Sequence, residues 1–91
     1  MEIREILRKM VTAGRTAYMC HTSMQDIGYD NTPYFDIYGE IADAIYVLIG
    51  ENTQTYHESI TYQTLTNLDM SISECVIRLG DEYDKRQKGC C

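Results

Sequence analysis

Apolar residues recur every three or four positions along most of this 91-residue chain, and this period is what most limits its fold. An α-helix has about 3.6 residues per turn, so such spacing places the apolar side chains on one face. The chain has one proline and six glycines, too few for a loop-rich fold. We therefore expect a single all-α domain over residues 1–85, followed by a flexible tail over residues 86–91.

The pattern divides into three predicted helices that form a small bundle. The first covers residues 2–25, and Gly14 in the middle of its apolar face marks either a break or a close helix contact. A turn at residues 28–31 follows. The Thr32–Pro33 pair then predicts the start of a second helix, because threonine caps helices well and proline fits the first helical position. Gly50 is the expected end of this helix.

The third predicted helix is long, and Thr61, Thr64 and Thr66 lower helix propensity early in it, which leaves a broken start as an alternative. Thr55 and Glu58 have the spacing of a capping box, so we expect the helix to begin there and to run to about Lys85. Because the preceding link is short, the second and third helices should form an antiparallel hairpin. Met70 and Ile77 form a second apolar stripe on the third helix, which either serves self-association or is covered by the first helix.

Lysine and arginine are absent between Arg15 and Arg78, although this stretch is rich in aspartate and glutamate. The whole chain has a formal net charge of −6. A surface of this kind repels nucleic acids and anionic membranes and attracts basic proteins. The alternative is that acidity only maintains solubility. The residues that we expect on an acidic, partner-binding surface are Asp26, Tyr29, Asp30, Asp36, Glu40, Asp43 and Val47.

The first predicted helix also carries a narrow basic stripe. Arg4, Arg8 and Arg15 fall on one flank of it, and Tyr18 follows one turn later. Arginine binds phosphate through paired N–H donors, and a tyrosine ring can stack on a base. These residues predict an alternative site for an anion or nucleotide, which requires an oligomer that gathers several stripes around one pocket.

The residues that could ligate a metal or act as nucleophiles form no recognisable motif. The chain has no C-x-x-C, no H-x-x-x-H, no phosphate-binding loop and no G-x-G-x-x-G. We expect no metal, no cofactor and no enzymatic activity, and we interpret His21 as a core histidine. With no export signal and no membrane-spanning apolar run, we expect reduced thiols in a cytoplasmic protein. The side chains considered are Cys20, His21, His57, Cys75, Cys90 and Cys91.

Two stretches, Ala44–Glu51 and Glu58–Tyr62, resemble short helical proteins encoded in prophages of Gram-positive bacteria. The resemblance covers about the middle half of the chain. It implies a phage context, in the cytoplasm of an infected or lysogenic bacterial host. The Thr-Pro-capped helix, the short link and the long helix opened by Glu58 also look like the hairpin of phage anti-CBASS sponge proteins. That likeness implies an oligomer that sequesters cyclic-nucleotide signals.

Three functions follow from these observations. The charge pattern and the phage-like character together favour an anti-CRISPR-like inhibitor, which would bind a bacterial defence protein with a basic channel and would contact neither nucleic acid nor membrane. The second function is the oligomeric sponge built on the arginine stripe. The third is a dimeric structural or regulatory module joined through Met70 and Ile77.

Overall fold

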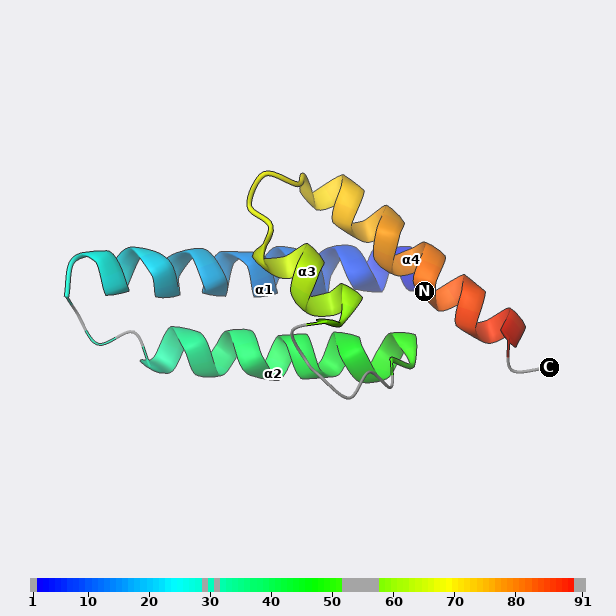
Figure 1. Ribbon diagram of the computed structural model, residues 1–91, viewed down its shortest axis with the longest axis horizontal. Helices are drawn as coiled ribbons and strands as arrows, with labels where there is room; N and C mark the ends of the chain where they lie inside the picture. The colour runs from blue at the N-terminus through cyan, green and yellow to red at the C-terminus, as the bar shows by residue number, and fades with distance from the viewer. Residues whose placement is uncertain (1, 29, 31, 52–57, 90–91) are drawn as a thin grey trace.

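The protein is an all-α bundle of four helices within the part of the chain that the computed structural model describes, namely residues 2–28, 30, 32–51 and 58–89. The expectation of three helices is wrong, because the stretch predicted as one helix over residues 55–85 contains two. Residues 86–89, expected in a flexible tail, continue the last helix. The four elements are α1 (Ile3–Asp26), α2 (Thr32–Ile49), α3 (Ile60–Thr66) and α4 (Ile72–Gly89) (Figure 1).

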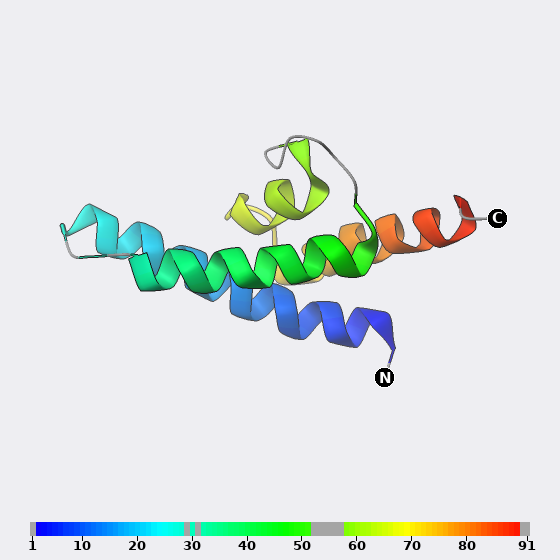
Figure 2. The same cartoon turned by 90° about the horizontal axis from the view of Figure 1, so that it is seen from below.

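Helices α1 and α2 pack against each other as an antiparallel hairpin, and this hairpin sets the long axis of the molecule (Figure 1). The main hairpin is therefore made by the first and second helices, and the expectation of a hairpin of the second and third helices is wrong. Helices α3 and α4 lie on one side of it, as the view turned by 90° shows (Figure 2). At Gly14, an added Cβ would lie 3.0 Å from Cγ2 of Ile41. Of the two interpretations of Gly14, the close helix contact is the one observed, and α1 continues through it.

Helix α2 begins and ends where the sequence predicts. It starts at Thr32, and Gly50 follows its last residue with a left-handed φ of 80°. The N–H of Gly50 donates to the carbonyl of Val47 at 3.1 Å, and the N–H of Glu51 donates to that of Tyr46 at 3.1 Å. This pair of bonds is the Schellman arrangement, which glycine favours because it has no Cβ to clash at positive φ.

The join between α3 and α4 is held by a buried arginine of α1. The Arg15 guanidinium donates to the carbonyls of Thr64 at 3.1 Å, Asn67 at 2.9 Å and Met70 at 2.6 Å. It also lies 3.0 Å from Sγ of Cys75. In a continuous helix these carbonyls would accept from their own helix, so binding to Arg15 accompanies the break over residues 67–71.

The start of α3 is capped by side chains that differ from the predicted pair. The Glu51 carboxylate accepts from the N–H groups of Ile60 and Thr61, both at 2.9 Å, and the Ser59 hydroxyl accepts from the N–H of Tyr62 at 3.0 Å. Glu58 precedes the helix, and Thr55 lies outside the described residues. The predicted capping box at Glu58 is therefore wrong.

The core lies where the hairpin meets α3 and α4. Leu68 continues the apolar spacing of the stretch expected to be the third helix, yet it is half exposed because it falls in the break. Among the described residues, none of the helices combines the length and apolar character that crossing a bilayer requires. The buried hydrophobic residues are Leu7, Val11, Ala17, Tyr38, Ala42, Ile45, Ile49, Leu65, Cys75, Val76 and Leu79.

Candidate functional site

The outer edge of α2 carries a stripe of exposed carboxylates. Asp36, Glu40 and Asp43 are spaced four and three residues apart, which places them on one side of the helix. Val47 continues this stripe by one turn, and its side chain is 75% exposed. The core residues of α2 lie on its opposite side. We call the surface formed by these four residues the acidic edge.

The charges of the acidic edge are not compensated by ion pairs within the described part of the chain. The ion pairs there involve only Arg4 and Arg86 as the basic partners. Exposed carboxylates that form no ion pair produce a negative potential that extends into solvent for about a Debye length, roughly 8–10 Å at physiological salt. The acidic edge therefore favours an approaching surface that is positively charged.

An apolar contact area adjoins these carboxylates. Phe35 is 51% exposed and lines a shallow hollow of about 320 Å³ together with Gly39 and the three acids. The Phe35 ring is held from behind, with its centroid 5.1 Å from that of His21 and 6.2 Å from that of Tyr38. A half-exposed ring of fixed orientation beside carboxylates suits a partner with both apolar and basic side chains.

The remaining acids of the predicted surface lie at the turn between α1 and α2. Asp26 is the last residue of α1 and is exposed, whereas Tyr29 lies outside the described residues. The Asp30 carboxylate accepts from the N–H of Thr32 at 3.0 Å. This main-chain hydrogen bond lowers the pKa of Asp30, so its negative charge persists to lower pH than usual. The predicted surface is thus divided between the acidic edge and the hairpin turn.

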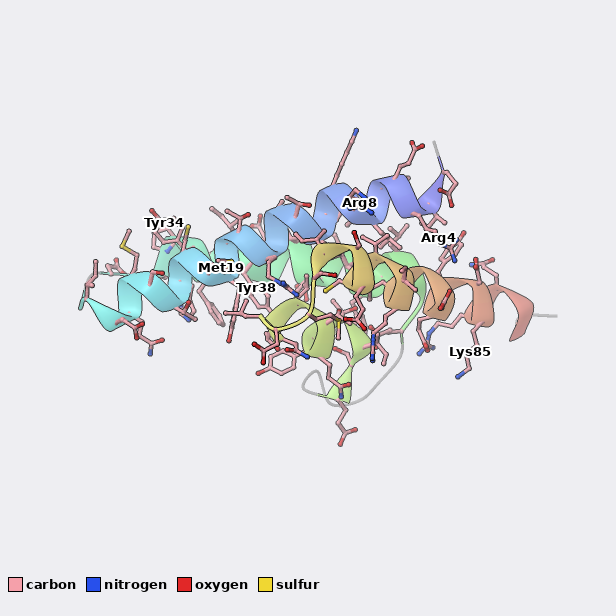
Figure 3. The ribbon with its side chains drawn as sticks, turned by 90° about the horizontal axis from the view of Figure 1, so that it is seen from above. Arg4, Arg8, Met19, Tyr34, Tyr38 and Lys85 are labelled. Carbon is pink, nitrogen blue, oxygen red and sulfur yellow. The ribbon has the colours of Figure 1, made fainter. Side chains whose placement is uncertain are left out.

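The arginines of the predicted basic stripe do not share a surface. Arg15 faces inward and is occupied by main-chain carbonyls, so its assignment to an exposed anion site is wrong. Arg4 lies between α1 and α4 (Figure 3), where its guanidinium binds Asp84 at 2.8 Å. The Tyr18 ring packs on that of Tyr38, with centroids 5.3 Å apart. Of the three arginines, Arg8 is the exposed one.

The predicted stripe of Met70 and Ile77 is also separated by the break in the third helix. Met70 lies in the segment before α4 and packs against the core. Ile77 lies on α4, is 57% exposed, and borders a different hollow, between α1 and α4. The two residues therefore do not form one self-association surface.

The cysteines and histidines that were considered for chemistry are dispersed. Cys75 is buried beside Arg15, and burial raises the pKa of its thiol. Cys20 is half buried on α1, and the Tyr18 and Phe35 rings lie near that of His21. No group of three or more potential metal ligands occurs among the described residues. His57, Cys90 and Cys91 lie outside them.

The buried hydrogen-bonding roles of Arg15 and Glu51 were not predicted from the sequence. The chain offers a weak signal for the first: Arg15 follows Gly14, at a position one turn after Val11 on a buried side of α1. A guanidinium at such a position needs hydrogen-bond acceptors inside the fold. No comparable signal marks Glu51, because its role as an acceptor depends on the start of α3 lying beside it in the folded chain.

The fold and this surface define a small all-α protein with an acidic helix edge. Comparison of the chain with protein-family models, with curated proteins and with solved structures finds no significant match. The functional argument therefore rests on the geometry of the acidic edge and its surroundings.

Proposed function

We propose that this protein is a non-catalytic inhibitor that binds a basic, nucleic-acid-binding protein of a bacterial defence system through the acidic edge of α2. The observation that carries the proposal is the row of exposed carboxylates, Asp36, Glu40 and Asp43, without ion-pair partners among the described residues. Such a row resembles the regular negative charge of a nucleic-acid backbone in sign and exposure. A basic channel would therefore attract both this row of carboxylates and a nucleic-acid backbone.

The apolar side chains beside the row support a protein partner. Val47 and Phe35 are both more than half exposed, and both lie beside the carboxylates on α2. Carboxylates steer the encounter and set its specificity, while apolar and aromatic groups supply much of the affinity of a protein interface. The resemblance of two sequence stretches to prophage-encoded proteins agrees with a target in a bacterial host.

The nucleotide sponge has less support from the geometry. It requires Arg4, Arg8 and Arg15 to meet a phosphate together, and two of these guanidinium groups are engaged within the fold. The dimer through Met70 and Ile77 also has less support, because the break in the third helix separates these two residues.

The test is binding by a double variant with reversed charge. The tagged protein is recovered from lysate of a host that carries a defence system, the bound protein is identified by native mass spectrometry, and its affinity is then measured with both proteins purified. We expect Glu40→Lys with Asp43→Lys to weaken binding by about tenfold or more, because attraction becomes repulsion.

A matched control separates the acidic edge from net charge. Asp69 and Glu74 are exposed acids near the start of α4, so Asp69→Lys with Glu74→Lys changes the net charge equally at another place. This variant should bind almost normally. Equal weakening by both double variants, or no weakening by the first, would contradict the proposal.

A further inference from the structure

One side of the α1–α2 hairpin has no cover. Helices α3 and α4 lie on its other side, and no further described element packs here (Figure 1, Figure 2). The uncovered side contains a shallow hollow of about 330 Å³. Its floor is apolar and its two edges carry opposite charges. The lining residues are Lys9, Met10, Ala13, Glu40, Ile41 and Ala44.

Two parallel stripes run along α1 with the same alternating spacing of four and three residues. The first stripe, which includes Leu7, Val11 and Gly14, is buried against the rest of the chain. The second stripe is shifted by one residue toward the uncovered side and is uncharged throughout. Its members are Ile6, Met10, Ala13, Ala17, Cys20 and Met24, of which Ala17 is buried and Ala13 is exposed.

Helix α2 repeats this doubling. Its buried stripe has the same spacing and consists of Tyr38, Ala42, Ile45 and Ile49. A second apolar stripe, again shifted by one residue, consists of Ile37, Ile41, Ala44 and Leu48. None of these four residues is fully buried, and Ile37 is 49% exposed. Both helices of the hairpin thus present a partly exposed apolar stripe to the same side, although Met10, Ile41 and Leu48 also pack against the core.

Alternating spacing of four and three is the heptad pattern by which helices pack side by side in bundles. A hairpin that carries this pattern on both helices can pair with another such hairpin to give four helices around a common seam. The small side chains of Ala13 and Ala44 lie in the exposed middle of the seam, where they would allow close approach. A second copy of this hairpin supplies the same pattern.

The charges at the edges of the hollow also favour a second copy. Lys9 borders it on the α1 edge, and Glu40 borders it on the α2 edge. If α1 of one copy lies over α2 of the other, Lys9 of each copy faces Glu40 of the other. If α2 of one copy instead lay over α2 of the other, the carboxylates of the two copies would repel each other.

We propose that two copies of this chain associate through the uncovered side of the α1–α2 hairpin, with α1 of each copy over α2 of the other. The result is a symmetric dimer with an intermolecular four-helix bundle. This surface shares Glu40 with that of the proposed inhibitor function and otherwise differs from it. Asp36, Asp43 and Val47 lie farther around α2 and stay open to another partner.

The test is the mass in solution of matched variants, measured by sedimentation across a range of concentrations. The wild-type chain should approach twice its 10.5 kDa mass as concentration rises. Ala13→Glu places a carboxylate in the apolar seam and should weaken dimerisation about 100-fold. Thr12→Glu changes the neighbouring exposed residue, outside the seam, and should dimerise like the wild type.

Two outcomes would overturn the proposal. One is a wild-type protein that stays monomeric up to high micromolar concentration, and the other is undiminished dimerisation of Ala13→Glu. A readout that needs no variant is alkylation of Cys20, which lies in the seam and should react more slowly as dimer forms. Normal binding of the basic partner by monomeric Ala13→Glu would show that this proposal and the inhibitor function are independent.

The relative order of the helices has its own test. Lys9→Glu and Glu40→Lys should each weaken the dimer, and the doubly reversed chain should regain most of the loss, since opposite charges again face each other. Failure of the double variant to recover would overturn the placement of α1 over α2.

Discussion

At the scale of single residues, the Arg15 guanidinium is a buried charge that depends on main-chain acceptors. Its side chain comes from α1, yet its hydrogen bonds end on carbonyls of Thr64, Asn67 and Met70. It forms no ion pair within the described part of the chain. Main-chain dipoles therefore compensate a buried charge, and the same bonds satisfy carbonyls that the helix break would otherwise leave unpaired.

We expect Arg15→Met to lower the free energy of unfolding by about 3 kcal/mol, because buried carbonyls lose their donors at once. Arg8→Met, on the same helix but exposed, should change it by no more than about 0.5 kcal/mol. Urea unfolding followed by circular dichroism measures both. Similar values for the two variants would show that Arg15 does not hold the join.

Cys75 should make stability depend on pH in the alkaline range. Burial raises the pKa of its thiol above the ordinary value of 9.0. As pH rises through that value, the unfolded chain loses this proton first, so it holds fewer protons than the folded chain and unfolding becomes more favourable. The contribution is fully present below pH 9 and is lost above it.

The measurement is the free energy of unfolding of wild type and Cys75→Ala between pH 7 and pH 10. Every other titrating group is common to the two chains, so the difference between them isolates the Cys75 thiol. A difference that stays constant across this range would contradict the prediction.

At the scale of elements, α3 is a short helix that depends on its neighbours. It has 7 residues, and a helix of this length is unstable alone in water. The Glu51 carboxylate and the Ser59 hydroxyl bind the N–H groups of its first turn, and Arg15 binds the carbonyl of Thr64 near its end. Glu51 and the N-cap residue Ser59 thus stabilise the start of α3, and Arg15 stabilises its end.

Glu51→Ala should therefore loosen α3 selectively. We expect the free energy of unfolding to fall by about 2 kcal/mol, since two main-chain donors lose a charged acceptor. Hydrogen exchange of the Ile60 and Thr61 amides should accelerate more than that of the α1 core. Glu58→Ala, an exposed neighbour, provides the control, and equal effects of both changes would argue against the cap.

Local pattern was enough to predict α1 and the end of α2, because helix periodicity, the turn and Gly50 are all local signals. It did not predict the break in the third helix, because apolar spacing continues through Leu65, Leu68 and Ile72. The break involves an arginine 49 to 55 positions away in sequence, which no local pattern reveals. The acidic edge could be proposed from spacing alone, whereas the packing of Phe35 beside it required the aromatic contacts between helices.

At the scale of the whole molecule, charge varies along an axis of 49 Å. The hairpin turn, with Asp26 and Asp30, lies at one end, and Figure 3 shows Arg4, Arg8 and Lys85 toward the other. Cations at that end are mixed with carboxylates, as in the ion pairs of Arg4 and Arg86. The acidic edge and the turn therefore dominate the field that a distant basic partner meets.

We expect the association rate with the partner to fall by about tenfold or more as salt rises from about 50 to 500 mM, while the dissociation rate changes little. Long-range attraction acts before contact, so screening affects mainly the encounter. Stopped-flow mixing measures both rates. The Glu40→Lys and Asp43→Lys double variant should show a shallower salt dependence, and an identical slope would contradict electrostatic steering by this edge.

The reach of Arg15 across the fold also constrains how the protein is made. A ribosome releases α1 well before the segment that carries the acceptor carbonyls, the last of which lies 55 positions later. Until then the growing hairpin must keep a charged side chain in water at the place where its core will close. We therefore expect the nascent α1–α2 hairpin to remain loosely packed, and the fold to lock only when α3 and α4 emerge and dock.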